Sequence, residues 1–217
     1  MTDAISIDSV FLNYGNQLVL NGVHLTFHRH RIVGILGRNG CGKSSFLKVL
    51  IGHLNPTSKY IKYDGRLIQQ PFKHKGLINY LPQHHFHPKL LSVSTIIQYY
   101  GLSVESFLDE YAFFKEEINH VFGELSGGKK RLLEVLLVLE APTKFTILDE
   151  PFSHIMPLHV ELITEKIKQF RSRKGILLTD HQHEFVTEIA DEIYLMTSGT
   201  LRPVESEEDL RFLGYVR

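Results

Sequence analysis

The sequence predicts an α/β protein with a mainly parallel sheet, an antiparallel β layer and a short helical subdomain. Short apolar runs with β character alternate with segments of helical periodicity, and residues 89–141 interrupt that alternation with predominantly helical sequence. The length of 217 residues suits a single domain, because one core stops growing near ~250 residues. We expect one domain over 1–217, with an α/β core from 1–88 and 142–217 and the helical subdomain at 89–141.

The first elements are strands. Residues 4–14 (AISIDSVFLNY) alternate between apolar and polar side chains, as a strand does. A second run of this kind occupies 17–27, after a turn, so the two runs predict the antiparallel layer. Residues 31–37 (RIVGILG) form a short apolar run that ends at a glycine. Residues 43–54 follow with apolar side chains at helical spacing. The order is therefore strand, glycine-rich turn, helix.

The remaining core elements flank the helical subdomain. Two strand-like runs precede it, YIKYDGRLI and LINYLPQ. After it we expect a strand at 144–151, a helix at 160–173, a strand at 175–180 and a hairpin at 192–203. The subdomain thus divides the parallel sheet in the sequence.

The composition excludes several classes of protein. Lys and Arg total 24 and Asp and Glu total 24, so no global field attracts nucleic acid or anionic lipid. The single cysteine, Cys41, excludes an internal disulfide and suits a reducing compartment. The N-terminus lacks the basic start and apolar core of a signal peptide, and the apolar run at 132–139 is much shorter than the ~20 residues that span a bilayer. The histidines of HHFHP lack the spacing of a zinc site, so we interpret them as loop or solvated histidines.

Residues 37–44, GRNGCGKS, match the phosphate-binding loop (Walker A). The glycines let backbone N–H groups point at phosphate oxygens, and the following helix adds the positive end of its dipole. Lys43 is then expected to hold the β and γ phosphates, and the Ser44 hydroxyl to bind Mg²⁺. A chance glycine-rich turn with these fixed positions would occur in on the order of 1% of chains this long. The position between a strand and a helix favours the phosphate loop.

FTILD, at 145–149, is an apolar strand that ends in an acid. This arrangement places Asp149 beside the phosphate loop, where it can hold Mg²⁺ through water. Glu150 is one residue further on, where it can polarise a water as a general base. Without the loop at 37–44 the two acids would be interpreted as an ordinary pair at the end of a strand. The presence of the loop favours a functional role for both.

ELSGGKKR, at 124–131, predicts a second anion site, because Ser-Gly-Gly opens a helix that we expect at 132–140. A simple helix cap is an equal reading, since Ser is a favoured N-cap residue. Two phosphate sites in one chain require an explanation.

GRNGCGKS, LSGG and ILDEP, in this order, resemble the ATP-binding cassette (ABC) ATPases, which have a phosphate-loop NTPase core. The resemblance covers essentially the whole chain and is nearest to cassettes for lipopolysaccharide export or branched-chain amino-acid import. It implies ATP and Mg²⁺ as ligands and a dimer in which the LSGG of one protomer covers the γ-phosphate of the other. The implied nucleotide contacts are Tyr14, Gly37, Asn39, Gly40, Cys41, Gly42, Lys43, Ser44, Ser45, Ser126, Gly127 and Gly128; the implied metal ligands are Ser44, Gln83 and Asp149.

The resemblance gives three further residues a role. Tyr14 is similar to the aromatic residue that stacks on adenine, although a strand aromatic can also be part of a core. Gln83 is similar to the glutamine that contacts Mg²⁺ and the attacking water, and His181 to the histidine that binds the γ-phosphate and orients Glu150. The implied catalytic residues are Glu150, His181 and Gln83.

The chain also departs from the family pattern. Lys129 occupies the place of the usual Gln or Glu, and Leu132 that of a common arginine. Ile155 and Met156 replace a Leu-Asp pair that crosses the dimer interface. Because Met cannot make the hydrogen bonds that Asp makes, the resemblance implies altered communication between the two sites.

The leading hypothesis is an Mg-dependent transporter ATPase. It would work as a dimer, most simply a homodimer, on the cytoplasmic face of the membrane with a separate membrane-spanning permease, and without nucleic acid. The alternative is the ATPase of a soluble complex of the iron–sulfur assembly type, since a basic cluster also follows SGG there. A nucleotide sensor that hardly turns over is a third hypothesis.

Overall fold

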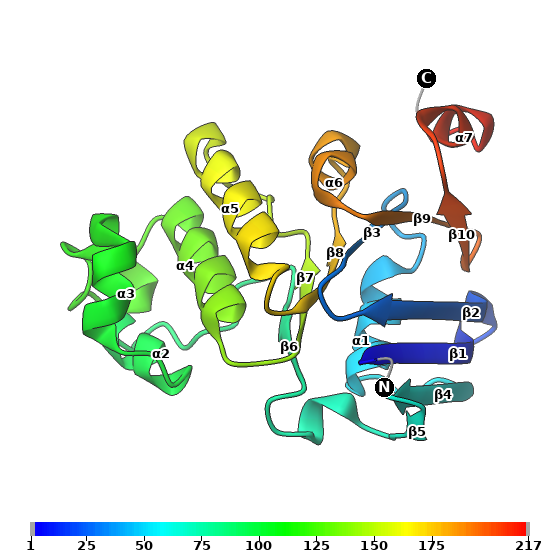
Figure 1. Ribbon diagram of the computed structural model, residues 1–217, viewed down its shortest axis with the longest axis horizontal. Helices are drawn as coiled ribbons and strands as arrows, with labels where there is room; N and C mark the ends of the chain where they lie inside the picture. The colour runs from blue at the N-terminus through cyan, green and yellow to red at the C-terminus, as the bar shows by residue number, and fades with distance from the viewer. Residues whose placement is uncertain (1–2, 216–217) are drawn as a thin grey trace.

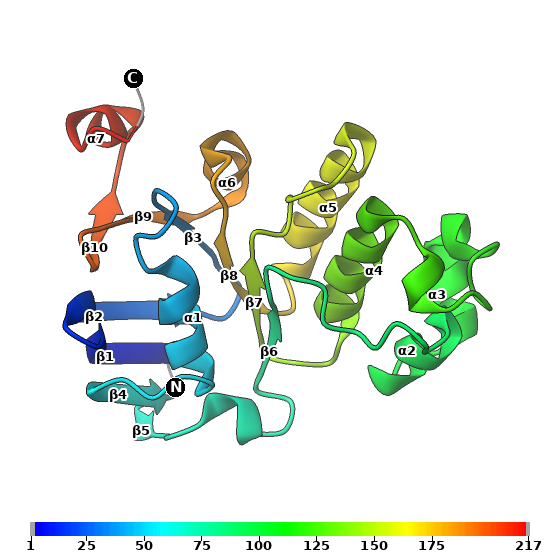
Figure 2. The same cartoon turned by 180° about the vertical axis from the view of Figure 1, so that it is seen from behind.

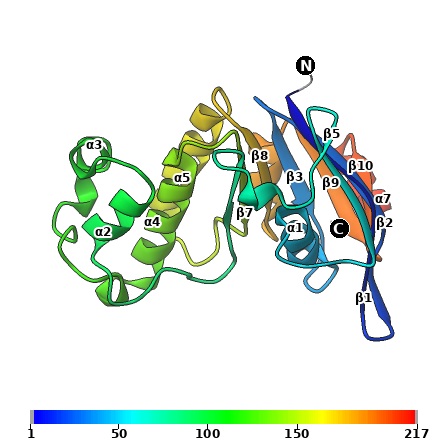
Figure 3. The same cartoon turned by 90° about the horizontal axis from the view of Figure 1, so that it is seen from below.

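The computed structural model describes residues 3–215, and it contains two β-sheets that enclose helix α1 (Lys43–Ile51) between them (Figures 1 and 3). The smaller sheet is antiparallel and has the strand order β2-β1-β4-β5. Its strands are β1 (Ala4–Tyr14), β2 (Gln17–His28), β4 (Ser58–Tyr63) and β5 (Arg66–Leu67). This sheet is the antiparallel layer that the alternation in the sequence predicts.

The larger sheet has six strands in the order β10-β9-β3-β8-β7-β6. Only β10 is antiparallel to its neighbour; the pairs from β9 to β6 are parallel. Its strands are β3 (Ile32–Leu36), β6 (Ile78–Leu81), β7 (Phe145–Asp149), β8 (Gly175–Thr179), β9 (Glu192–Thr197) and β10 (Thr200–Val204). The predicted α/β fold class with a mainly parallel sheet is confirmed.

The helices α2 (Val93–Tyr99) and α3 (Val104–Glu110) lie at the end of the molecule opposite the small sheet (Figures 1 and 2). They precede the longer helix α4 (Gly127–Glu140), and the three helices occupy the segment expected to be helical. The remaining helices are α5 (Pro157–Phe170), α6 (His183–Ile189) and α7 (Glu207–Phe212), with 3-10 turns at Pro71–Lys73, Ala112–Phe114 and Phe122–Glu124. Within residues 3–215, no helix has the length and apolar character needed to cross a membrane.

Three helices have boundaries that differ from the sequence prediction, and one of them is α5, which covers Pro157–Phe170 rather than 160–173. Helix α4 begins at Gly127 rather than at 132, because Ser126 accepts a hydrogen bond from the Lys129 N–H at 3.3 Å and so caps the helix. Helix α1 ends at Ile51 rather than at 54, because Gly52 adopts a left-handed φ of 85° that closes the helix.

Two hydrophobic cores lie on opposite faces of the parallel sheet. One joins α1 to the small sheet, with Phe27, Phe46 and Phe145 fully buried. The other joins α4, α5 and α6 to the sheet and extends to the helices α2 and α3. Since β3, β6, β7 and β8 are parallel, their carboxyl ends meet at one edge, where ligands bind in folds of this type.

Candidate functional site

The segment Gly37–Ser44 connects β3 to α1 at this edge of the sheet. Gly40 and Gly42 have φ angles of 80° and 112°, a region that residues with a Cβ rarely adopt. No side chain caps the N-terminus of α1, so its first N–H groups remain available to a ligand. The segment therefore has the backbone of an anion-binding loop.

Lys43 is the first residue of α1, directly after the glycines of this loop, and is 6% exposed. Its Nζ donates to the Gly37 carbonyl at 2.6 Å and to the Arg38 carbonyl at 3.3 Å. These acceptors are neutral, whereas a phosphate oxygen carries charge and accepts a stronger hydrogen bond. The lysine is thus held within the loop at a position that suits an anionic ligand.

Asp149, at the end of β7, is 1% exposed, and its carboxylate accepts hydrogen bonds from three hydroxyl groups. Ser44 and Thr179 donate to Oδ1 at 3.2 and 2.8 Å, and Tyr80 donates to Oδ2 at 3.0 Å. Burial and the neighbouring Asp149 carboxylate raise the pKa of Tyr80, which keeps its hydroxyl protonated as a donor. A buried carboxylate next to a serine hydroxyl offers the hard oxygen ligands that suit Mg²⁺.

Glu150 has a left-handed backbone, with φ at 52°, which is strained for a residue other than glycine. Its N–H donates to the Thr179 carbonyl at 2.8 Å, a contact that holds this conformation. Its side chain is oriented from two sides, because Gln83 Nε2 and Ser153 Oγ both donate to Oε2, at 2.9 and 3.2 Å. The carboxylate is 8% exposed and faces the loop of Lys43.

His181 is half-exposed and follows β8. Its Nδ1 lies 3.9 Å from Glu150 Oε2 and 3.3 Å from Asp180 Oδ1. Asp180 is fully buried, and this burial raises the pKa of its carboxyl group. The N–H groups of Gln182 and Phe152 donate to that carboxyl, so Asp180 links the segment of His181 to the segment after Glu150.

A pocket of about 470 Å³ brings most of these residues together. It is lined by Tyr14, Gln17, Val19, Asn39, Gly40, Gly42, Lys43, Ser44, Ser45, Gln83 and Glu150. Tyr14 is 51% exposed rather than part of the core, and its hydroxyl lies 3.1 Å from Ser45 Oγ. Asp149 is not a lining residue, although Ser44 connects it to the pocket. Gly37, Cys41 and His181 are likewise absent from the lining.

The LSGG segment lies apart from this pocket. Ser126 and Gly127 are exposed at the N-terminus of α4, and Gly128 packs against the His154 carbonyl, where an added Cβ would come within 3.3 Å. Both readings of the serine therefore remain compatible with the structure: Ser126 caps α4, and the N–H groups that follow are exposed to a further molecule.

The structure also shows residues that the motifs did not indicate. Gln17 and Val19 line the pocket, and the hydroxyls of Tyr80 and Thr179 orient Asp149. Tyr80 is three residues before Gln83 on β6, and Thr179 is the last residue of β8. The signal that could have indicated Tyr80 and Thr179 is their position near the carboxyl ends of parallel strands.

Two of the three histidines of HHFHP, His85 and His87, have partners in the fold. His85 Nδ1 lies 2.7 Å from Glu134 Oε2, and His87 Nδ1 lies 3.4 Å from Glu134 Oε1. Among the described residues, no group of three or more His, Cys, Asp or Glu side chains has the arrangement of a metal site. The histidines of HHFHP lie in a loop, as predicted, but the side chain of His87 is only 8% exposed and is therefore not solvated.

The chain is similar to known ATP-binding proteins of transporters. The family model described as ABC transporter matches residues 20–153. The lipopolysaccharide export system ATP-binding protein LptB of Haemophilus influenzae is 29% identical over 214 residues, which cover 91% of this chain and 88% of that protein. The uncharacterized ABC transporter ATP-binding protein YhaQ of Bacillus subtilis is 26% identical over 237 residues, which cover 96% of this chain and 79% of that one.

A solved structure of the ATP-binding subunit of an ABC transporter superposes with a TM-score of 0.84. The superposition covers 97% of this chain and 93% of that one at 21% identity, so it supports the fold. The similarity to LptB confirms the predicted likeness to lipopolysaccharide-export cassettes. The likeness to branched-chain amino-acid cassettes stays a prediction.

Proposed function

The chain belongs to the ABC transporter family as an ATP-binding, ATP-hydrolysing subunit, and we propose that hydrolysis occurs in the pocket around Lys43 and Glu150. The observation that carries this proposal is the position of two carboxylates on successive residues. Asp149 is buried among hydroxyls, while Glu150 turns into the pocket through its left-handed backbone. The two acids therefore have separate surroundings, as a metal ligand and a general base require.

The phosphates of ATP fit the loop Gly37–Ser44. Its N–H groups and the N-terminus of α1 would bind phosphate oxygens, and Lys43 would exchange its carbonyl acceptors for the charged phosphates. Adenine would stack on Tyr14, which is exposed at the pocket. Ser44, Asp149 and Gln83 would hold Mg²⁺, which when bound neutralises the charge of the phosphates.

Hydrolysis needs a water oriented towards the terminal phosphate and a base to accept its proton. Glu150 supplies the base, and Gln83 and Ser153 fix its carboxylate through Oε2. His181, half-exposed and 3.9 Å from the same oxygen, would bind the terminal phosphate and keep Glu150 oriented. Because the folded chain already holds Glu150 in this orientation, little entropy is lost in orienting the base when the substrate binds.

A second copy of the chain would complete the site. Ser126, Gly127 and Gly128 lie outside the pocket of their own protomer but present a helix N-terminus to solvent. In a dimer they would bind the terminal phosphate held by the partner's loop. This arrangement accounts for two anion sites in one chain.

The work of hydrolysis would go to a membrane-spanning permease, with this chain peripheral on the cytoplasmic face. The family match and the relatives favour transport over a role in iron–sulfur assembly. Both relatives are named as ATP-binding proteins, of an export system in one case and of an ABC transporter in the other.

Glu150→Gln tests the proposed chemistry, because the amide keeps the shape of the side chain and removes its basicity. We expect ATP binding within about threefold of the wild type, turnover reduced by about a hundredfold or more, and an ATP-bound dimer in size-exclusion chromatography. Turnover near that of the wild type would remove Glu150 as the base. A variant that binds ATP and remains monomeric would contradict the composite site.

A further inference from the structure

Arg131, on the first turns of α4, is 2% exposed and directs its guanidinium at three backbone carbonyls. Its NH1 donates to the Pro82 carbonyl at 2.7 Å, and its NH2 donates to the carbonyls of Asp149 and Glu150 at 2.6 and 2.8 Å. Pro82 precedes Gln83, so one side chain binds both segments that carry the groups around Glu150 Oε2. No other described residue has hydrogen bonds to all three of these carbonyls.

Glu134, one helical turn after Arg131, holds the same loop from its other side. Its Oε1 accepts the Phe86 N–H at 3.1 Å, and its Oε2 lies 2.7 Å from His85 Nδ1 and 3.9 Å from Arg131 NH1. Glu134 is completely buried. The loop that carries Gln83 is therefore attached to α4 at Pro82 and again at Phe86.

A buried guanidinium is expensive, and this one is not fully compensated. Burial lowers the pKa of Arg131, and its buried Nε has no hydrogen-bond partner among the described residues. A buried charge of this kind rarely adds net stability compared with an apolar side chain of similar size. What the guanidinium contributes is the fixed position of the carbonyls of Pro82, Asp149 and Glu150, to which it donates.

We propose that Arg131 is a positioning residue for ATP hydrolysis, which sets the distance between Gln83 and Glu150 by binding the backbone of both segments. This inference rests on the proposed function of Glu150 and Gln83. Arg131 touches neither ATP nor the attacking water; it acts on the backbone that presents Glu150 in its left-handed conformation.

The planar fork of arginine explains the residue type. Its two NH₂ groups have a fixed geometry and donate at the same time to carbonyls at the ends of two strands, whereas the ammonium group of a lysine is a single point charge. The position also accounts for one departure from the family pattern. Leu132, where an arginine is common, is fully buried in the core, and the arginine of this chain lies one position earlier, facing the site.

Three variants test the proposal. Arg131→Met removes the donors and keeps an apolar stem, Arg131→Lys keeps the charge without the fork, and Lys174→Met is the matched control. Lys174 is also a buried basic side chain bound to carbonyls, those of Val138 and Ala141, but it contacts no residue of the site. It therefore reports what removal of a buried basic side chain does outside the site.

We expect Arg131→Met to lower kcat by about tenfold to a hundredfold while ATP affinity stays within about threefold. Arg131→Lys should fold and recover part of kcat. In the nucleotide-free proteins, hydrogen exchange should be faster at 82–87 and 149–153 in the Arg131 variants. Lys174→Met should show neither the fall in kcat nor the faster exchange, even where its thermal stability differs from that of the wild type.

The proposal is overturned if folded Arg131→Met or Arg131→Lys keeps the kcat of the wild type, or if exchange at 82–87 and 149–153 is unchanged. It is also overturned if Lys174→Met lowers kcat to the same degree, because the effect would then follow the loss of any buried basic side chain. If Arg131→Met does not fold, Arg131→Lys decides alone. Failure of the proposed function is a separate result: the wild type would then bind or hydrolyse no ATP.

Discussion

The two ends of helix α4 are attached to the parallel sheet by different means. At the N-terminal end, Arg131 binds carbonyls of the segments that carry Gln83 and Glu150. At the C-terminal end, Lys174 donates to the Ala141 carbonyl at 2.5 Å and lies 3.3 Å from Thr146 Oγ1. The first attachment reaches the candidate site, and the second reaches only the end of the helix and the sheet.

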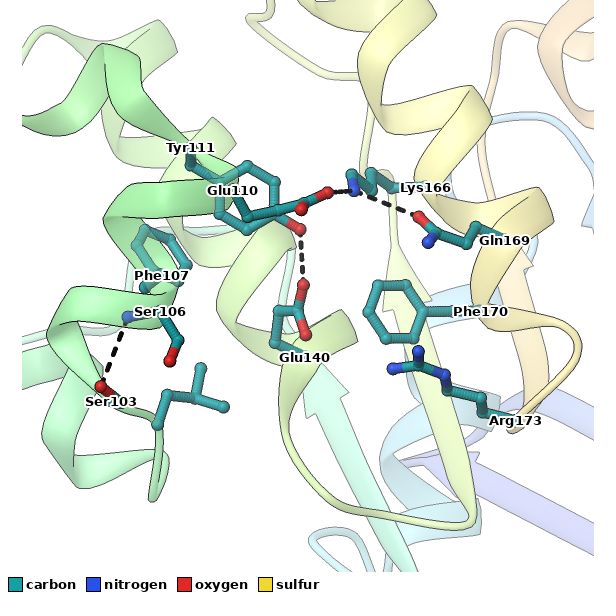
Figure 4. A pocket seen from close by; sticks show the side chains of 11 residues that line it. Ser103, Ser106, Phe107, Glu110, Tyr111, Glu140, Lys166, Gln169, Phe170 and Arg173 are labelled. Atoms are coloured by element: carbon teal, nitrogen blue, oxygen red, sulfur yellow. Dashed lines mark hydrogen bonds and ion pairs between the residues drawn. The ribbon is translucent and has the colours of Figure 1, made fainter.

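The far end of α4 also borders a cavity of about 250 Å³ between α3, α4 and α5, and Figure 4 shows the polar side chains that cross it. Tyr111 donates to Glu140 Oε1 at 2.6 Å, and Lys166 pairs with Glu110. None of the predicted site residues lines this cavity. Buried polar groups thus position the candidate site at one end of the helix and join the helix to neighbouring elements at the other, and variants at each end should separate the two roles.

Lys43→Ala should have the largest effect on ligand binding. The variant loses a charge-assisted hydrogen bond to phosphate worth about 1.5–3 kcal/mol, so the Kd for ATP should rise by about tenfold or more. Isothermal titration calorimetry measures the change. Lys166→Met, which removes a cation at the far end, is the control and should keep its affinity. Equal affinities for the wild type and Lys43→Ala would remove Lys43 from the site.

Lys174→Met should change how stability depends on pH. Burial lowers the pKa of Lys174 to about 7, whereas an unfolded lysine titrates near ~10.4. Between these values the unfolded chain binds more protons, so this residue makes the wild type more stable as pH rises, by up to about 1.4 kcal/mol per pH unit. The unfolding free energy of the wild type minus that of the variant should therefore increase from pH 7 to 9.

Urea titrations at several pH values measure this difference, with Lys168→Met as the control for loss of an exposed lysine. Parallel curves for the wild type and Lys174→Met would contradict the prediction. ATP hydrolysis, normalised to folded protein, should be the same in all three proteins, because Lys174 lies at the far end of α4.

Gln83→Ala returns to the site end and sharpens the comparison. Glu150 would lose the donor 2.9 Å from Oε2, and we expect kcat to fall by about tenfold through poorer orientation. Melting temperature should change little, since Gln83 is exposed. Steady-state kinetics measure the effect against Gln98→Ala, an exposed glutamine on α2. A lower melting temperature with unchanged kcat would show that Gln83 contributes to stability rather than to the orientation of Glu150.

Tyr111→Phe should have the smallest effect. It removes one hydrogen bond to Glu140 and should lower the unfolding free energy by about 1 kcal/mol, or the melting temperature by about 2–4 °C. Differential scanning calorimetry measures this against Tyr99→Phe, whose side chain is 76% exposed. Hydrolysis should be unaffected. A loss of kcat in Tyr111→Phe would show that the far end also controls the site.

The site was predictable where its residues are contiguous in the chain. GRNGCGKS follows a strand, and Asp149 and Glu150 end another, so strand order and motif spacing were enough to indicate them. Tyr80, Thr179 and Arg131 act across 18 to 69 residues of sequence, as their hydrogen bonds to Asp149 and Glu150 show. No local pattern records such a contact, because periodicity reports which face is apolar rather than which strand lies opposite.

Sequence by itself therefore determined the fold class, the order of most strands and helices, without α6 and α7, and the chemistry available at the strand ends. These follow from short-range rules: apolar periodicity, the backbone freedom of glycine and the acid at a strand end. Only the tertiary structure decided that Glu150 adopts a left-handed backbone and that Arg131, rather than Leu132, faces the site. Both depend on which distant carbonyls and side chains the packed sheet and α4 bring within hydrogen-bond distance.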